Sequence, residues 1–247
     1  MGLFNLFGKK PKAESEIDQT LRVDFHSHLL PGIDDGCQTM EDSLENIREL
    51  QKQGVKKIIT TPHIFQELYP NTPEIIRSKL AQVRKALSDH QIEMDIEATA
   101  EYYLDEWFCE NFKDIELLTL PGKYILVETN YMERPHFLEE ILFELQLSGY
   151  KVILAHPERY NYLLGDFSKL DDLFDTGILF QCNLLSFTGY YSPRIREASM
   201  HLLRNKMIHI VGSDIHKIKH STTITQFKKT KEYGELLKLN LMNNSFE

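Results

Sequence analysis

Short apolar segments that recur along the chain, each followed by a helix-like pattern, constrain the fold of this 247-residue protein more than any other feature. The segments are rich in β-branched and aliphatic residues. Several are apolar on both faces, as parallel strands buried in the middle of a domain are. There are seven such segments, and they span residues 21–25, 56–61, 95–100, 124–129, 151–156, 178–183 and 207–212.

Apolar residues at helical spacing fill the intervals between the predicted strands. Thr39 and the Thr72-Pro73 pair are suitable helix starts, and Gly54 and Gly149 are suitable helix ends. The predicted helices cover residues 40–50, 76–87, 137–145, 195–203 and, with a weaker pattern, 223–241. The alternation predicts one α/β domain over residues 21–247. It leaves open whether the strands form an open sheet or a barrel.

Composition argues against several classes of function. The formal net charge of −9 argues against a nucleic-acid binder that works through a basic face. No stretch approaches the roughly 20 apolar residues that a membrane span needs. Three scattered cysteines, Cys37, Cys109 and Cys182, form no CxxC pair and suit a reducing environment. We therefore expect a cytoplasmic protein with no nucleic-acid partner and no integral membrane contact.

Residues 1–20 lie before the first predicted strand. Their short apolar piece precedes the basic residues, which is the reverse of a signal peptide. Leu6 stands where the myristoylation pattern requires Ser or Thr. We predict a flexible N-terminal tail. The alternative is weak contact with a membrane or a partner through Leu3, Phe4, Leu6 and Phe7.

Residue types that bind metals stand at the ends of the predicted strands. They are His26, His28, His63, Glu101, Glu128, His156, Asn183, Asp214 and His216. A lone histidine at a strand end is more often a capping or core residue, and an HxH pair can simply pack together. However, six of the seven strand ends carry His, Asp or Glu, and parallel barrel strands open their C-terminal ends on one face. Without a metal, such a cluster would be poorly compensated.

The predicted cluster contains no thiolate. Imidazole mixed with carboxylate suits Zn, Mn or Fe, and not a structural zinc site of the cysteine type. The candidates exceed what one ion needs, so we expect two to three divalent ions. Clustered divalent ions stabilise an attacking hydroxide and the oxygens of a phosphoryl group. Hydrolysis of a phosphate ester is therefore the predicted reaction.

Four segments, FHSHLLPGIDDG, TTPH, HPER and GSDIH, resemble the polymerase-and-histidinol-phosphatase (PHP) superfamily. More closely, they resemble the PHP-type bacterial protein-tyrosine phosphatases of capsule and exopolysaccharide loci (the CpsB/YwqE group). The resemblance runs from about Val23 to His216. It implies a single-domain distorted seven-stranded β/α barrel, (β/α)7, with three metal ions that are usually manganese.

The resemblance also implies which residues bind each ion. His26, His28 and Asp214 would bind the first, with Glu101 as a bridge; Glu128 and His156 would complete the second; Asp35, His63 and His216 would hold the third. Asp34 is adjacent to Asp35 and is the alternative ligand at that position.

Arg159 in the HPER segment matches the arginine that holds the substrate phosphate in these enzymes. The family often carries a second basic residue beyond the last DxH. Ser221 stands near that position here, so the second contact is either missing or has moved to Lys217, Lys219 or His220. Most rim tyrosines are expected to be ordinary loop residues, while one or two flank an entering phenyl ring; the tyrosines are Tyr102, Tyr103, Tyr131, Tyr160, Tyr162, Tyr190 and Tyr191.

The implied function is a protein-tyrosine phosphatase that acts on the phosphotyrosine tail of a bacterial kinase controlling capsule or exopolysaccharide synthesis. Metal-bound hydroxide would attack the phosphorus directly, and His216 or a metal-bound water would protonate the leaving oxygen. No Cys is followed six residues later by Arg, so the phosphocysteine mechanism is not expected. The alternatives are a PHP phosphatase of a small molecule such as histidinol phosphate, and a catalytically idle metal-stabilised binding domain.

Overall fold

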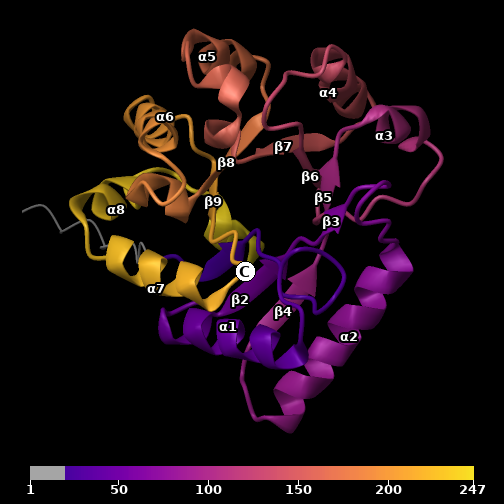
Figure 1. Ribbon diagram of the computed structural model, residues 1–247, viewed down its shortest axis with the longest axis vertical. Coiled ribbons are helices and arrows are strands. Elements are labelled where there is room, and N and C mark those ends of the chain that lie inside the picture. Colours follow the sequence, from indigo (N-terminus) through magenta and orange to yellow (C-terminus); the bar gives the residue numbers. More distant parts are fainter. Residues whose placement is uncertain (1–19) are drawn as a thin grey trace, which may run out of the picture.

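The computed structural model describes residues 20–247, which form parallel strands surrounded by helices (Figure 1). One sheet has the order β1-β2-β4 and consists of β1 (Val23–Phe25), β2 (Lys57–Thr60) and β4 (Asp95–Ala98). The other has the order β3-β5-β6-β7-β8-β9 and consists of β3 (His63–Ile64), β5 (Glu101–Tyr103), β6 (Tyr124–Glu128), β7 (Lys151–Ala155), β8 (Leu179–Asn183) and β9 (Ile210–Gly212). The strand pairs are parallel, which confirms the predicted α/β class. The predicted tail lies outside the described residues except for Thr20.

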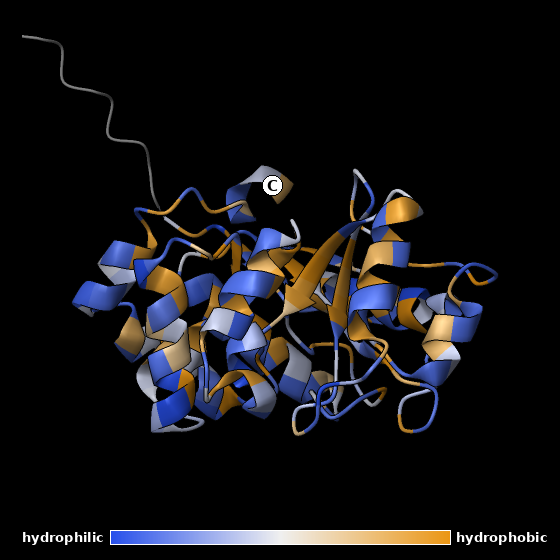
Figure 2. Ribbon diagram, turned by 90° about the horizontal axis from the view of Figure 1, so that it is seen from above, coloured by the Kyte–Doolittle hydropathy of each residue, from blue (hydrophilic) through white to orange (hydrophobic). Residues whose placement is uncertain are grey.

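The helices lie around the outside of the strands, and apolar residues concentrate on the strands between them (Figure 2). They are α1 (Met40–Lys52), α2 (Pro73–Asp89), α3 (Glu106–Asn111), α4 (Leu138–Leu147), α5 (Ser168–Asp175), α6 (Pro193–Arg204), α7 (Ile218–Phe227) and α8 (Lys231–Leu236). The apolar stripes predicted for α1 and α2 are buried. Within the described residues, no helix combines the length and apolarity that crossing a membrane requires.

Two predicted strands are each followed, after a break, by a further short strand that the sequence pattern did not predict. Residues 56–61 contain β2, and the chain breaks before β3; residues 95–100 contain β4, and the chain breaks before β5. Pro62 lies in the first break and has no N–H to donate to a ladder. Each break moves the chain from the three-stranded sheet to the six-stranded sheet. As a result, His63 and Glu101 begin neighbouring strands and lie opposite each other in register.

The prediction of one closing helix over residues 223–241 is wrong. The structure has α7 and α8 there, and the Thr230 side chain accepts a hydrogen bond of 3.3 Å from the backbone N of Tyr233 to begin α8. A side-chain oxygen used as a cap competes with continuation of the preceding helix. Helices α3 and α5 lie in intervals for which no helix was predicted.

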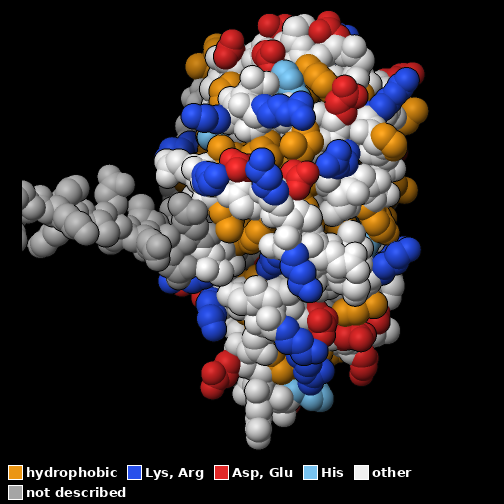
Figure 3. All heavy atoms as spheres, turned by 90° about the vertical axis from the view of Figure 1, so that its left-hand side faces the viewer, with side chains coloured by type: hydrophobic (Ala, Val, Ile, Leu, Met, Phe, Trp, Pro, Cys, Tyr) orange, Lys and Arg blue, Asp and Glu red, His pale blue; other side chains and the backbone are white. Residues whose placement is uncertain are grey.

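The face that α6, α7 and α8 present carries charges of both signs (Figure 3). Arg196 Nη2 of α6 lies 3.5 Å from Glu232 Oε1 of α8, and Lys238 Nζ lies 2.9 Å from Glu235 Oε1. Interspersed charges differ from the uniformly basic surface that binds a phosphate backbone without sequence preference.

Strands β1 and β9 approach each other where the two sheets meet. A Cβ atom on Gly212 would lie 2.0 Å from the carbonyl oxygen of Phe25, so only glycine fits at this contact. Just beyond, the backbone N of Asp214 donates to the carbonyl of His26 at 2.8 Å. Among the described residues, no strand ladder joins β1 to β9. The segments that carry the predicted ligands His26 and Asp214 are therefore joined at this seam by individual hydrogen bonds and not by a strand ladder.

The side chain of a buried asparagine links β1 to β9 by hydrogen bonds where no strand ladder joins them. Asn243 belongs to the 3₁₀ turn Asn243–Phe246 near the C-terminus. Its Oδ1 accepts from the backbone N of Val211 at 3.0 Å. Its Nδ2 donates to the carbonyls of Val211 at 2.7 Å and Val23 at 3.1 Å. One side chain thus bonds to both strands at the seam.

We predict that Asn243→Ala lowers the free energy of unfolding by about 2–4 kcal/mol, because buried backbone groups on both strands lose their partner. Urea denaturation measures this loss. Asn240→Ala is the matched control, since Asn240 is exposed, and its stability should stay within about 0.5 kcal/mol of the parent. Equal stability of the two variants would contradict the bridging role of Asn243.

Candidate metal centre

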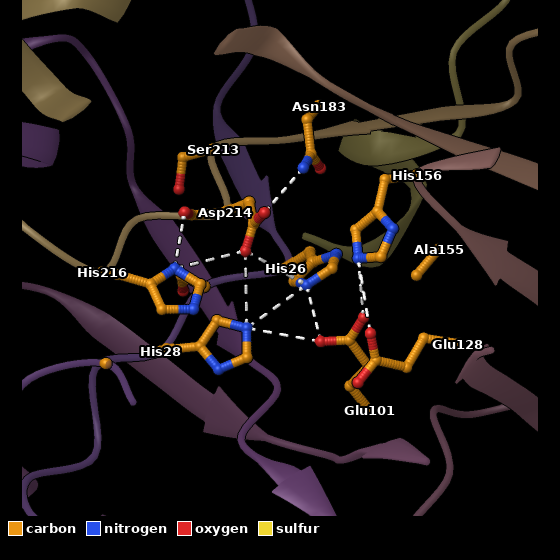
Figure 4. A network of polar contacts seen from close by, with 12 residues as sticks. His26, His28, Glu101, Glu128, Ala155, His156, Asn183, Ser213, Asp214 and His216 are labelled. Atoms are coloured by element: carbon orange, nitrogen blue, oxygen red, sulfur yellow. Dashed lines mark hydrogen bonds and ion pairs between the residues drawn. The ribbon is translucent and has the colours of Figure 1, made fainter. Parts of the chain in front are cut away.

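The residues predicted to bind metal converge on one basin, where β1, β2, β4, β6, β7 and β9 end, and Figure 4 shows most of them. The basin opens into a cavity of about 270 Å³, lined by most of these side chains and by Arg159. The nine residues that gather there are His26, His28, Asp35, His63, Glu101, Glu128, His156, Asp214 and His216. Their convergence follows from the two chain breaks and the parallel strands.

Three of these residues have left-handed backbone conformations. The φ angles are +79° for His26, +33° for His156 and +49° for Asp214. Non-glycine residues rarely adopt such angles, which concentrate at functional sites. Each one turns the chain sharply at a strand end. The backbone at Gly36 packs so closely against His28 that a Cβ at position 36 would lie 2.3 Å from the Cβ of His28, so a larger residue does not fit there.

The nine side chains form four overlapping groups, in each of which the ligand atoms lie within 4.8 Å of one another. The groups are His26, His28 and Asp214; His26, Glu101 and His156; His63, Glu101 and Glu128; and His28, Asp35, His63 and His216. Glu101 belongs to two groups, and its Oε2 lies 3.0 Å from His26 Nε2 while its Oε1 lies 3.0 Å from His156 Nε2. This is the placement that a bridging carboxylate needs.

Asp34 and Asp35 have different environments. Asp34 is buried; its Oδ2 accepts from His28 Nδ1 at 2.8 Å, and its Oδ1 accepts from the backbone N of Gly36 at 3.0 Å. The Asp35 side chain is 52% exposed, and its Oδ1 lies 3.4 Å from the Nε2 atoms of both His63 and His216. The geometry therefore favours Asp35 as the ligand and Asp34 as the group that orients His28.

The side-chain amides of Gln181 and Asn183 in β8 form hydrogen bonds to the proposed metal ligands. Of the two, only Asn183 was noted in the sequence. Gln181 Oε1 accepts from His26 Nδ1 at 2.8 Å and from the backbone N of His156 at 3.2 Å. Gln181 Nε2 donates to Asn183 Oδ1 at 2.9 Å, and Asn183 Nδ2 donates to Asp214 Oδ2 at 2.6 Å. Because Gln181 accepts from Nδ1, the lone pair of His26 Nε2 faces the basin. Polar residues at alternate positions of an apolar strand were the available signal.

The carboxylates of the basin strongly attract positive charge. Burial opposes ionisation of His28, but Asp34 raises the pKa of His28 to about 10. Burial likewise opposes a charge on His63, yet Glu128 and Glu101 raise the pKa of His63 well above its usual value. The pKa of Glu101 falls well below its usual value despite burial, because imidazoles surround it. Imidazole nitrogens and carboxylate oxygens in this arrangement fit divalent cations.

Arg159 lies beside the basin on the 3₁₀ turn Pro157–Arg159 that follows β7. Its Nη1 donates to Asp214 Oδ2 at 2.8 Å. The guanidinium carbon lies 4.9 Å from the ring centre of Tyr131 and 4.3 Å from that of Tyr191. The Arg159 side chain is 21% exposed. Two rings and a carboxylate thus hold it while it still reaches the cavity.

The structure places none of the suggested second basic contacts in the cavity lining. Lys217, Lys219, His220 and Ser221 are absent from it, and among the described lining residues Arg159 is the one Lys or Arg. Ser221 instead accepts from Gln53 Nε2 at 2.6 Å, at the C-terminal end of α1.

The rim tyrosines lie in different environments. Tyr102 and Tyr160 are fully buried, whereas Tyr103 and Tyr131 line the cavity. Sequence reasoning missed further lining residues from the segment after β3: Phe65, Leu68 and Tyr69. Tyr69 stacks on the predicted ligand His63, with ring centres 5.5 Å apart.

Comparison with known proteins places the chain among capsule-synthesis proteins. Residues 22–238 match the family model described as "Capsular polysaccharide synthesis, CpsB/CapC". The chain is 32% identical to the tyrosine-protein phosphatase YwqE of Bacillus subtilis over 227 residues, covering 90% of this chain and 89% of that protein. It is 27% identical to the putative tyrosine-protein phosphatase CapC of Staphylococcus aureus, with coverage of 90% and 89%.

A solved structure shares the fold. The match belongs to work on YwqE from Bacillus subtilis and CpsB from Streptococcus pneumoniae, described as unique metal-dependent tyrosine phosphatases. The TM-score is 0.81 at 29% identity, covering 91% of this chain and 93% of that one. An amidohydrolase from Mycoplasma synoviae, at 12% identity and a TM-score of 0.56, shows likeness of fold alone.

We predict that Gln181→Leu weakens Mn²⁺ binding by about 10- to 100-fold, because His26 loses the acceptor that orients its ring. Gln181→Glu keeps an oxygen at that place and should retain most of the affinity. Calorimetric titration of chelator-treated protein measures both. Gln226→Leu, at an exposed position, controls for the loss of an amide. Parent-like Mn²⁺ affinity in Gln181→Leu would show that the amide does not support the ligands.

Proposed function

Because the chain belongs to the CpsB/CapC family of capsular polysaccharide synthesis, we propose that it is a metal-dependent protein-tyrosine phosphatase. The observation that carries the proposal is the meeting of four histidine–carboxylate groups with one half-buried arginine at a single cavity. The proposed ligands are the nine residues of the basin, which would hold two to three divalent ions. Manganese is the expected metal, with iron or zinc as alternatives.

Divalent ions bound at such a centre lower the pKa of bound water to about 7 and neutralise charge on phosphoryl oxygens. The chain itself supplies orientation. Arg159 supplies a positive charge, and Tyr131, Tyr191 and Asp214 fix the orientation of its guanidinium group. A phosphoryl group at the basin therefore has a charged donor on one side, and the planar guanidinium is suited to binding two phosphate oxygens at once.

Release of the tyrosine needs a proton on its oxygen. His216 lines the cavity, and its Nδ1 lies 3.0 Å from the carbonyl oxygen of Asp214. A coordinating imidazole nitrogen carries no proton, so we assign proton donation either to His216, in place of its ligand role, or to a water molecule of the cavity. A phenol, with a pKa of about 10, needs less acid assistance than an alkyl alcohol. This difference favours phosphotyrosine over phosphoserine.

The cysteines do not fit a thiolate mechanism. None of them lines the cavity in the described part of the chain. Burial raises the pKa of Cys37 to about 12 and that of Cys109 to about 11. Cys182 is fully buried, and its pKa is also raised well above its usual value. Thiols that stay protonated at neutral pH are poor nucleophiles.

The proposed substrate is the phosphotyrosine tail of a bacterial tyrosine kinase that controls capsule or exopolysaccharide synthesis, encountered in the cytoplasm. The family description and the names of the relatives support this proposal. The alternatives, hydrolysis of histidinol phosphate and a catalytically idle binding domain, are not favoured. All nine proposed ligands face the basin, which an idle domain would not require.

We predict that Arg159→Ala lowers kcat/KM on a phosphotyrosine peptide by about 10²–10³-fold, the usual cost of removing one charged contact to the reacting group. Metal content should stay that of the parent, because Arg159 is not among the proposed ligands. Arg48→Ala, at an exposed position of α1, is the control. Near-parent turnover in Arg159→Ala would move the phosphate contact elsewhere.

Substrate choice tests the proposed function as a whole. We predict that kcat/KM for a phosphotyrosine peptide exceeds that for a matching phosphoserine peptide and for histidinol phosphate by at least about tenfold, or about 1.4 kcal/mol. The three substrates are compared under one metal condition. If histidinol phosphate is the best substrate, the metal centre stands and the assigned substrate is wrong.

A further inference from the structure

Part of the cavity lining is aromatic and apolar. Phe65, Leu68, Tyr69 and Tyr103 line the cavity together with the proposed ligands, and we call these four residues the apolar shelf. Phe65 stacks on Tyr103 with ring centres 4.2 Å apart, and Tyr69 stacks on His63. The shelf therefore begins at the basin itself and extends outward from it.

The backbone of the shelf is held in place by hydrogen bonds. Phe65 and Tyr69 form an antiparallel bridge: the N of Phe65 donates to the O of Tyr69 at 3.0 Å, and the N of Tyr69 donates to the O of Phe65 at 2.7 Å. Asn71 Nδ2 donates to the carbonyls of Ile33 and His63, each at 2.8 Å. A surface fixed in this way loses little entropy when a ligand binds.

Leu68 stands out at the tip of this turn. Its residue surface is 66% exposed although it lines the mouth of the cavity. Single exposed leucines are common on proteins, but this one continues an aromatic surface that leads into a proposed active site. The residue before Leu68 is the acidic, exposed Glu67.

From this arrangement we infer that the apolar shelf binds the peptide on either side of the phosphotyrosine and selects apolar residues over acidic ones. The inference rests on the proposed function and extends it to the sequence around the target tyrosine. With the phosphoryl group at the basin and Arg159, the peptide leaves the cavity past Tyr69 and Leu68. An apolar flanking side chain gains buried area against Leu68, whereas an acidic one gains no apolar contact and is repelled by the neighbouring Glu67.

The test uses the full chain with Mn²⁺ and four substrates. Three are phosphotyrosine peptides identical except for the residues that flank the phosphotyrosine, which are Leu, Ser or Glu; the fourth is 4-nitrophenyl phosphate. The variant is Leu68→Ser. The control is Leu147→Ser at the end of α4, because Leu147 has the same exposure of 66% and lies outside the cavity lining.

We expect the parent to prefer the Leu peptide to the Glu peptide by about tenfold in kcat/KM. Leu68→Ser should lower kcat/KM on the Leu peptide by about fivefold, through KM, and change the Ser peptide and 4-nitrophenyl phosphate by less than about twofold. Leu147→Ser should match the parent on all four substrates.

Three results would overturn the inference. An unchanged rate of Leu68→Ser on the Leu peptide would show that the shelf makes no contact with the peptide. An equal loss on all four substrates would show that Leu68 supports the site and does not select its ligand. A parent enzyme that hydrolyses no phosphotyrosine peptide would overturn the proposed function, and the inference with it.

Discussion

Carboxylates can be buried side by side only where positive charge lies between them, and this constraint governs the whole domain. Glu101 is fully buried, and imidazoles from three other segments, His26, His63 and His156, lie against its two oxygens. An isolated ion in such a place would cost several kcal/mol. The breaks after β2 and β4 and the left-handed strand ends bring these groups together. Divalent ions satisfy the same requirement, which is why the geometry and the proposed chemistry agree.

Much of the fold and the cluster was predictable from local pattern. Apolar segments marked the strand positions, and His, Asp and Glu at their ends marked the basin, because both signals lie within a few residues of sequence. Stripes of apolar residues marked α1 and α2 for the same reason. The ligand roles themselves remain predictions, since proximity of donor atoms shows that an ion can be bound and does not identify it.

Other features could not be predicted because they depend on contacts between distant segments. At Pro62 the chain leaves one sheet for the other. Predicting this switch requires knowing that β2 pairs with β4 and that β3 pairs with β5. The distinction between Asp34 and Asp35 depends on which carboxylate His28 reaches, and Gln181 acts on histidines far away in sequence. The aromatic side of the cavity was missed for a simpler reason. Its unpredicted residues, Phe65, Leu68 and Tyr69, come from the segment of β3 and the turn after it, and the sequence pattern predicted no strand there.

The account is tested most directly by metal analysis of the purified protein together with its activity on a phosphotyrosine peptide. One sample is assayed as purified, after exhaustive chelation, and after Mn²⁺ is returned; a parallel sample is treated with a thiol-alkylating reagent. The account predicts two to three divalent ions per chain, loss of activity with the ions, recovery with Mn²⁺, and little effect of alkylation. Full activity in metal-free protein, or inactivation by alkylation with chelators inert, would contradict it.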